Sequence, residues 1–307
     1  MSSGDVVVAL DVGGTGMKCA LVRPDGDIVH AERHPTDAGR GPDAVVRSIL
    51  EVAEGLAGKA RADGLDPVAL GIAVPGVVDE VRGVAVWSAN VGFRNVPLRD
   101  LAVARLGLPT ALGHDVRAGG LAEARLGAGQ GSGQLLFVAI GTGIAAAHVV
   151  GGVAAVGAHG AAGEFGHILV RPCGPRCGCG RPGCLEAVAS AAAIARRYAE
   201  LADSPASAAD VARRAATGEP TAVRVWREAV EALADGLATA QALFDVERVV
   251  IGGGLAQAGP HLFDPLRAAL RERMTFHREP VLVAAALGDQ AGCLGAALLA
   301  LDARPHP

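Results

Sequence analysis

Apolar residues in the first part of the chain fall into short runs that end in turns rich in glycine or proline. Residues 6 to 29 predict a strand, a glycine-rich turn, a second strand, a Pro-Asp-Gly turn and a third strand. Residues 42 to 64 show apolar positions at helical spacing, and residues 68 to 79 predict a buried strand that ends in Pro-Gly. Residues 109 to 116 predict a short strand that leads into a helix over residues 117 to 126. This alternation is typical of an α/β domain.

The middle of the chain holds a long uncharged stretch. Residues 135 to 158 contain no Asp, Glu, Lys or Arg and are numerous enough to span a bilayer. Five glycines interrupt the stretch, however, and no Lys/Arg cluster or aromatic belt flanks it. It therefore predicts two buried strands joined by a glycine-rich turn. Farther along, we expect helices near residues 186 to 201, 219 to 244 and 264 to 273, a buried strand with a triple-glycine turn within 246 to 259, and an apolar helix from near Gln290.

The two halves of the chain share one turn sequence. Gly14-Thr15-Gly16-Met17 matches Gly141-Thr142-Gly143-Ile144 at an offset of 127 residues, and an apolar strand precedes each. Such a repeat suggests two halves of like design, and a length of 307 residues also favours two domains. We expect a small α/β domain over residues 1 to 117, with the helix of residues 290 to 307 packing back on it, and a large α/β domain over residues 118 to 289.

Composition narrows the class of protein. Half of the residues are hydrophobic and the charges are well mixed, which indicates an ordered globular chain. A net charge of -4 and an aromatic content of 3% argue against a nucleic-acid surface, whether basic or built of stacking rings. The N-terminus has no basic region, and its apolar run from Val6 to Leu10 is too short for a signal sequence, so we expect a cytoplasmic protein.

Three glycine-rich turns that follow apolar strands are candidates for phosphate binding. Glycine lets the backbone approach a ligand closely, and the exposed N–H groups of such turns form nests for anions. None of the turns matches a P-loop or a dinucleotide fingerprint, and a chain with 43 glycines also forms tight turns that bind nothing. The three turns are Gly13-Gly14-Thr15-Gly16, Gly141-Thr142-Gly143 and Gly252-Gly253-Gly254.

Two charged residues flank the first of these turns. Asp11 ends the first strand, where a carboxylate can hold a phosphate-bound Mg²⁺ through water. Lys18 follows the turn and is either a phosphate contact or a solvated strand residue. Farther along, Asp115 lies between a strand and a helix, where spacing alone favours an N-cap carboxylate. The alternative for Asp115 is a general base, which phosphoryl transfer to an alcohol needs within hydrogen-bond reach of the attacking hydroxyl.

Four of the six cysteines fall within twelve residues. In a reducing compartment such clusters are more often metal ligands than disulfides. Cys177, Cys179 and Cys184 have a spacing that wraps one ion, and either Cys173 or His167 completes a tetrahedral zinc site.

Further residues around this cluster admit simpler explanations. Glu164 and Glu186 bracket the metal ligands, but exposed carboxylates at helix ends would look the same in the sequence. Cys19 and Cys293 lie in apolar surroundings and are expected to be small core residues.

Taken together, these segments resemble the ROK family of sugar kinases and repressors, within the actin-like sugar kinase superfamily. The resemblance covers nearly the whole chain and is most specific where E-x-G-H precedes C-x-C-G-x-x-G-C-x-E. The matching segments are LDVGGTGMK and IGTGIAAAHVVGG for the two phosphate loops, AVPGVVD for the Pro-Gly segment, GAAGEFGHILV with CGCGRPGCLE for the signature and zinc motif, and VVIGGGLAQAG for the adenosine-side loop.

The resemblance implies a two-domain actin-like (ribonuclease H-like) fold with an interdomain cleft, and ATP-dependent phosphorylation of a hexose with Asp115 as general base. It implies Mg²⁺ with ATP, one structural zinc held by His167, Cys177, Cys179 and Cys184, and a homodimer or homotetramer. Sugar contacts are implied for Gly76, Asn90, His114, Asp115, Glu164, His167 and Glu186. Contacts to ATP are implied for Asp11, Gly13, Gly14, Thr15, Lys18, Gly141, Thr142, Gly143, Gly253 and Gly254.

Departures from the family pattern leave the substrate open. The segment SANVGFRN resembles the family segment N-L-G-W with Phe93 in place of Trp, which makes glucose the first choice. His114 stands where the family usually has Asn, so N-acetylmannosamine, fructose and allose are alternatives, as is a sugar sensor without turnover. TGMK also resembles the first loop of polyphosphate-using relatives, SGIK. A repressor of this family is not expected, because the first strand begins near Val6 and leaves no room for a helix-turn-helix module.

Overall fold

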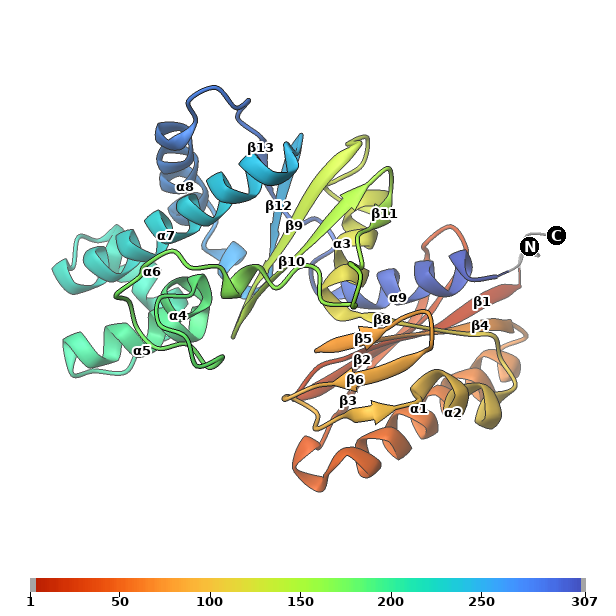
Figure 1. Cartoon of the computed structure of the whole chain (residues 1–307). Coiled ribbons are helices and arrows are strands. Elements are labelled where there is room, and N and C mark those ends of the chain that lie inside the picture. The colour runs from red at the N-terminus through yellow and green to blue at the C-terminus, as the bar shows by residue number, and fades with distance from the viewer. Residues whose placement is uncertain (1–3, 305–307) are drawn as a thin grey trace. The chain divides into compact units, whose positions relative to one another are not determined.

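The computed structural model describes residues 4 to 304 (Figure 1). Contacts along the chain divide it into two compact units, and each contains a five-stranded mixed sheet. Within the described residues, the first unit takes in residues 4 to 126, the segment Ala154–Ala162 and residues 289 to 304, and the second takes in Gly127–Val153 and Gly163–Gly288. The predicted boundary between residues 117 and 118 lies inside helix α3 (Asp115–Leu126), which belongs to the first unit.

The sheet of the first unit has the strand order β3-β2-β1-β4-β8. Helices cover both faces, with α1 and α2 on one side and α9 on the other (Figure 1). The approach of α9 is close, because a Cβ at Gly71 of β4 would lie 1.9 Å from the carbonyl oxygen of Ala296. The elements are β1 (Asp5–Val12), β2 (Gly16–Val22), β3 (Ile28–Pro35), β4 (Asp66–Val74), β8 (Thr110–His114), α1 (Pro42–Ala62), α2 (Leu98–Leu106), α9 (Ala291–Asp302) and the 3₁₀ helices Ala38–Arg40 and Gly288–Gln290.

A small antiparallel sheet follows β4 in the first unit. It has the order β5-β6-β7, with β5 (Val77–Asp79), β6 (Val84–Trp87) and β7 (Arg94–Val96). The chain enters it at Gly76, where φ is 101° and a Cβ would lie 2.2 Å from the carbonyl oxygen of Trp87. Only glycine fits this turn, which explains the Pro-Gly end of the predicted strand.

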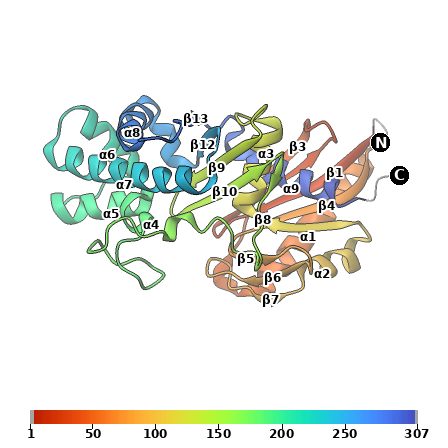
Figure 2. The ribbon, with the colours of Figure 1, turned by 45° about the horizontal axis from the view of Figure 1, so that its top comes forward.

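The sheet of the second unit has the order β11-β10-β9-β12-β13. Helix α7 contacts α4, α5, α6 and α8, and these helices gather at one end of the unit in Figure 2. The uncharged stretch is the hairpin of β9 and β10, so the prediction of two buried strands is confirmed. The elements are β9 (Gln134–Ile140), β10 (Ile144–Val150), β11 (Val153–Ala154), β12 (Arg248–Gly252), β13 (Val281–Ala284), α4 (Leu185–Ala189), α5 (Ala191–Ala202), α6 (Ala208–Ala216), α7 (Pro220–Phe244), α8 (Pro260–Arg273) and the 3₁₀ helices Phe165–His167 and Gly254–Ala258.

The repeated turn joins equivalent strands in the two units. β1 pairs antiparallel with β2, as β9 does with β10, and β1 and β9 are the central strands of their sheets. The first turn closes through a 2.9 Å hydrogen bond from Gly13 N to Gly16 O, and the second through a 2.9 Å bond from Gly141 N to Gly143 O. The sequence repeat therefore corresponds to a structural repeat.

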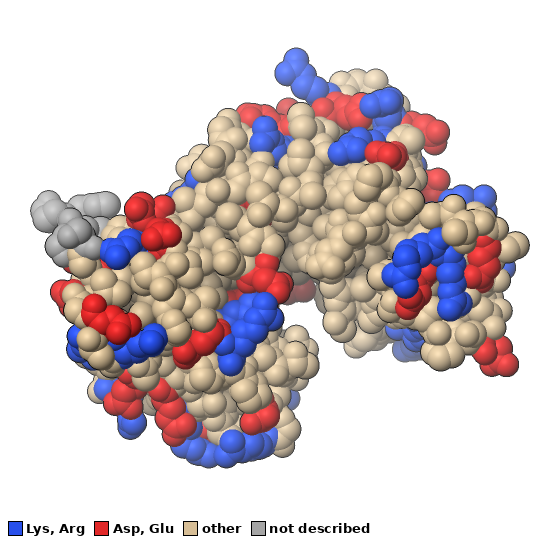
Figure 3. Space-filling model, turned by 180° about the vertical axis from the view of Figure 1, so that it is seen from behind, with Lys and Arg blue, Asp and Glu red and all other residues tan. Residues whose placement is uncertain are grey.

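Cys19 and Cys293 are both buried, with 1% and 4% of their surface exposed. Cys19 belongs to the apolar core of the first unit, whereas Cys293 lies close to Asp11. No helix between residues 4 and 304 is long and apolar enough to cross a membrane. On the face seen in Figure 3, basic and acidic residues lie intermixed.

Candidate active site

The turn after β1 is bonded from the side by Thr36, which directly follows β3. Thr36 donates from its Oγ1 to Gly13 O over 2.6 Å and from its backbone N to Thr15 O over 3.2 Å. A Cβ at Gly14 would lie 3.2 Å from the Cβ of Asn90, so the Asn90 side chain lies against the turn. Two hydrogen bonds from Thr36 therefore hold the turn, and an amide side chain lies beside it. Thr36 was not predicted, because only the pairing of β2 with β3 brings it here.

Asp11 at the end of β1 is a largely buried carboxylate. Its Oδ2 lies 3.9 Å from the Lys18 ammonium, and a Cβ at Gly292 would lie 2.2 Å from the same oxygen. Burial and the charge of Asp115 raise the pKa of Asp11 to about 6, although Lys18 opposes the shift. Burial makes the ionised form of Asp11 unfavourable, and a neighbouring cation would stabilise that form. This position therefore suits Mg²⁺ bound to phosphate.

Asp115 is the first residue of α3 and directly follows β8. Its Oδ1 accepts a 2.7 Å hydrogen bond from Val116 N and lies 3.3 Å from His114 Nδ1. Burial raises the pKa of Asp115, while the Val116 hydrogen bond and the charge of Arg117 lower it. Because 27% of the side chain is exposed, the same carboxylate can bind the helix amide and still reach a ligand. The N-cap interpretation of Asp115 is not confirmed, because the helix begins at Asp115 itself and His114 precedes it, with Nδ1 accepting from Arg117 N over 3.4 Å.

The glycine turn between β9 and β10 contacts an acidic side chain. Glu186 Oε2 accepts a 3.0 Å hydrogen bond from Ile144 N, and a Cβ at Gly143 would lie 2.5 Å from this oxygen. Ala191 N, at the start of α5, donates to Gly141 O over 2.9 Å. The loop is thereby bonded to residues of α4 and α5, and a side chain at position 143 would displace the Glu186 carboxylate.

The triple-glycine turn after β12 borders a cavity. At Gly253 φ is 79°, and a Cβ would lie 2.4 Å from the carbonyl oxygen of Ile140. The adjoining cavity has a volume of about 430 Å³, which is within the usual range for a small-molecule pocket. It is lined by Ala191, Ser207, Ala208, Ala209, Ala212, Arg213, Gly254, Leu255, Gln257, Ala258 and His261.

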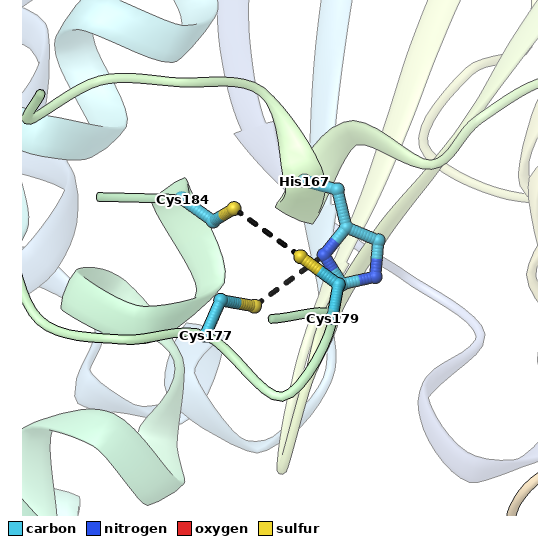
Figure 4. A group of neighbouring side chains, drawn as sticks. All are labelled: His167, Cys177, Cys179 and Cys184. Carbon is cyan, nitrogen blue, oxygen red and sulfur yellow. Dashed lines mark hydrogen bonds between the residues drawn. The ribbon is translucent and has the colours of Figure 1, made fainter. Parts of the chain in front are cut away.

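Three cysteines and a histidine converge in the second unit (Figure 4). Their four ligand atoms all lie within 4.8 Å of one another. Cys177 Sγ lies 3.6 Å from His167 Nδ1, and Cys179 Sγ lies 3.6 Å from Cys184 Sγ. Zinc bonds of about 2.0 to 2.3 Å in a tetrahedron separate the ligand atoms by roughly 3.4 to 3.8 Å, so the geometry fits zinc. Cys173 is exposed and outside the group, which leaves His167 as the fourth member.

The thiols of this cluster differ in acidity. A backbone hydrogen bond involving Arg181 lowers the pKa of Cys179 to about 6, whereas burial raises the pKa of Cys184 to about 12. Binding of a metal would therefore displace a proton from Cys184 at neutral pH.

The other nitrogen of His167 faces a carboxylate. Its Nε2 lies 3.7 Å from Glu164 Oε2, so Nδ1 is directed at the cysteines and Nε2 at the acid. Gly163 precedes Glu164 with φ of 98°, and a Cβ there would lie 2.0 Å from the carbonyl oxygen of Ala146. The cluster and β10 together set the position of Glu164.

The predicted site residues divide between the two units. The first unit holds Asp11, Gly13, Gly14, Thr15, Lys18, Gly76, Asn90, His114 and Asp115. The second holds Gly141, Thr142, Gly143, Glu164, His167, Cys177, Cys179, Cys184, Glu186, Gly253 and Gly254.

Each unit has a five-stranded mixed sheet with a glycine turn after its central strand, and the solved ROK kinases that share this fold place the chain in the actin-like class of sugar kinases. The chain belongs to the ROK family, whose sequence model matches residues 7–303. The predictions of an α/β actin-like fold and of ROK membership are thus confirmed.

Named relatives match over nearly their full length. The glucokinase of Thermotoga maritima is 36% identical, with 95% of this chain and 96% of that protein covered. The N-acetylmannosamine kinase of Shigella flexneri is 33% identical, with 96% and 98% covered.

Two solved structures share the whole fold. The ROK hexokinase of Thermus thermophilus superposes with a TM-score of 0.86 at 35% identity, over 96% of this chain and 98% of that one. The ROK glucokinase of Streptomyces griseus, in complex with glucose and AMPPNP, has a TM-score of 0.81 at 32% identity, over 97% and 99%.

Proposed function

We propose that this protein is a sugar kinase that transfers the γ-phosphoryl group of ATP to glucose and forms glucose 6-phosphate. The observation that carries the proposal is the Asp115 carboxylate, which is partly exposed, has a raised pKa and shares its unit with a glycine turn that Thr36 holds by a hydrogen bond. Whole-length similarity to relatives named glucokinase supports the same reaction.

Asp115 would act as the general base. As the 6-hydroxyl oxygen attacks the γ-phosphorus, the carboxylate takes the hydroxyl proton and the bond to the bridging oxygen of ADP breaks. Because burial raises its pKa, Asp115 is a stronger base than an ordinary aspartate once it is ionised.

The glycine turns would bind the phosphates. Gly13 N and Gly141 N already donate within their turns, so the remaining N–H groups of the two turns would meet the anionic oxygens, with Lys18 beside the first turn. Mg²⁺ bound with ATP would neutralise phosphate charge, and Asp11 is the residue that would hold it through water. The cavity beside Gly254 suits the adenosine of ATP, which favours ATP over polyphosphate as the donor.

We assign one structural zinc to His167, Cys177, Cys179 and Cys184. Four protein ligands leave no open position on the ion, so its contribution is to fix the fold of this loop. That fold would set Glu164, His167 and Glu186 toward the sugar hydroxyls, while Gly76, Asn90 and His114 would contribute from the first unit.

The second candidate for the substrate is another hexose. One relative is named N-acetylmannosamine kinase, and His114 stands where the family usually has Asn. A sugar sensor without turnover, a homodimer or homotetramer, and a cytoplasmic location also remain predictions, the oligomer being open to test by sedimentation.

A substrate panel tests the proposal. Glucose, N-acetylmannosamine, fructose and allose would each be assayed with ATP and with polyphosphate. We expect the highest kcat/KM for glucose with ATP. Turnover of another sugar alone would correct the substrate, and sugar binding by calorimetry without any turnover would establish the sensor.

A further inference from the structure

Arg117 is a buried cation two residues beyond the proposed base. Only 3% of its surface is exposed, although arginine is rarely buried without dedicated partners. Its Nε and Nη2 lie 3.0 Å and 2.8 Å from Glu80 Oε1. Its Nη1 donates to the carbonyl oxygens of Gly160 and Ala162, over 3.1 Å and 3.3 Å. One guanidinium therefore joins α3 to two distant segments of the first unit.

Glu80 and its neighbours complete this junction. Glu80 directly follows β5, and its Oε1 also lies 3.4 Å from His114 N, at the end of β8. A Cβ at Gly160 would lie 2.3 Å from the carbonyl oxygen of Val78, so the Gly160 segment is packed tightly on β5. Because the backbone at Gly160 is in close contact with β5, the carbonyl groups that bind Arg117 have little room to move.

His114 links the junction to the base. Its Nδ1 lies 3.4 Å from Arg117 N and 3.3 Å from Asp115 Oδ1. A shift of Arg117 would therefore move the first turn of α3, where the Asp115 carboxylate is bound.

The segment that Arg117 binds also has a distinctive place along the chain. Ala154–Ala162 belongs to the first unit, while the residues on either side of it belong to the second. Gly163 and Glu164 follow Ala162 directly. Arg117 lies on the helix that begins with the proposed base, and it binds the chain two residues before Glu164, a proposed sugar contact.

We propose that Arg117, paired with Glu80, is a positioning residue for phosphoryl transfer that fixes the end of the segment Ala154–Ala162 against the Asp115 end of α3. The proposal rests on the kinase function given above. Stability alone is a weak reason for such a pair, because buried ion pairs are often no more stabilising than apolar side chains of similar volume. The planar fork of arginine, by contrast, reaches one carboxylate and two carbonyls at once, which lysine cannot do.

Arg117→Lys is the first test, because it keeps the charge and loses the fork. We expect kcat/KM for the sugar to fall by about 10- to 100-fold while KM for ATP stays within about twofold, since small misplacements of reacting groups are costly. Hydrogen exchange at the amides of Gly160 and Ala162 should become faster. Arg125→Lys is the matched control, because Arg125 lies on the same helix but pairs with Asp302 at the surface, and it should leave both readouts unchanged.

A double variant guards against simple unfolding. Glu80→Gln with Arg117→Met removes both buried charges, so we expect it to fold, yet to show the same loss of sugar kcat/KM and the same faster exchange as Arg117→Lys. If exchange and sugar kinetics of Arg117→Lys match those of wild type, the positioning role is wrong. If wild type phosphorylates no sugar, the kinase function fails instead, and unchanged exchange in Arg117→Lys would show that the junction does not hold the segment either.

Discussion

Asp115 combines a bond to the helix backbone with partial exposure, and this combination predicts the effect of removing its charge. Asp115→Asn should keep the hydrogen bond from Val116 N and the fold, but an amide cannot take up the hydroxyl proton. We expect kcat to fall by about 10²- to 10⁴-fold, with sugar affinity within a few-fold of wild type by calorimetry. A folded variant that turns over near the wild-type rate would exclude Asp115 as the base.

The raised pKa of Asp115 predicts how activity depends on pH. The base works as a carboxylate, so kcat/KM should rise as pH rises through the pKa of Asp115 in the folded protein. Burial raises that pKa, so the acid limb should lie above the ordinary aspartate value of about 3.9. The groups around the carboxylate are His114, Asp11 and Arg117. Of these, the positive charge of Arg117 lowers the pKa of Asp115 and so opposes the effect of burial. An acid limb at or below about pH 4 would contradict the assignment.

At the scale of elements, the proposed zinc cluster of His167, Cys177, Cys179 and Cys184 predicts that two cysteines near each other in the sequence respond differently to substitution. Cys177 lies in the four-residue cluster and Cys173 is exposed outside it. Cys177→Ser should lower the zinc content from near one per chain and weaken sugar binding, because the loop that sets Glu164 and His167 would lose its anchor. Cys173→Ser should change neither quantity. Zinc analysis with sugar titration decides the point, and full activity in a metal-free protein would refute the assignment.

The turn after β12 predicts a defect in nucleotide binding. Gly253→Ala would bring a Cβ to about 2.4 Å from the carbonyl oxygen of Ile140 at a positive φ, so the turn must shift. We expect KM for ATP to rise by about tenfold or more, with a smaller change for sugar. Gly58→Ala is the control, because Gly58 lies on the exposed side of α1 with open space around it and should gain up to about 1 kcal/mol of stability. An unchanged KM for ATP in Gly253→Ala would remove this turn from the site.

The sequence predicted the elements whose signals are local. The central strands β1 and β9 are apolar runs ending in glycine turns, and both were predicted. β13 was missed, because its four residues owe their place to pairing with β12 about thirty positions earlier. The short helices α2 and α6 were missed as well. Residues alone left the fourth metal ligand open between Cys173 and His167, since only the folded chain brings the 3₁₀ helix of His167 to the cysteine turn.

The burial of Arg117 shows the limit of prediction for the site. Its sequence neighbours suggest only an ordinary position on a helix surface. Its partners are Glu80 and the backbone carbonyls of Gly160 and Ala162. No local sequence pattern predicts that these residues, far apart along the chain, contact Arg117.

At the scale of the whole molecule, each of the two units carries some of the residues proposed to take part in the reaction. The base and the first phosphate turn belong to one unit, and the second phosphate turn, the cavity beside Gly254 and the metal cluster belong to the other. The assignment of a sugar kinase therefore depends on the complete chain, in agreement with the match to the ROK family over residues 7–303.

Phosphorus-31 NMR of the purified protein with glucose, ATP and Mg²⁺ tests the central claim most directly. The proposed reaction predicts that glucose 6-phosphate and ADP appear in equal amounts, with no inorganic phosphate, and that Asp115→Asn slows both together. Release of inorganic phosphate without sugar phosphate, or no loss of ATP while glucose binds, would contradict it.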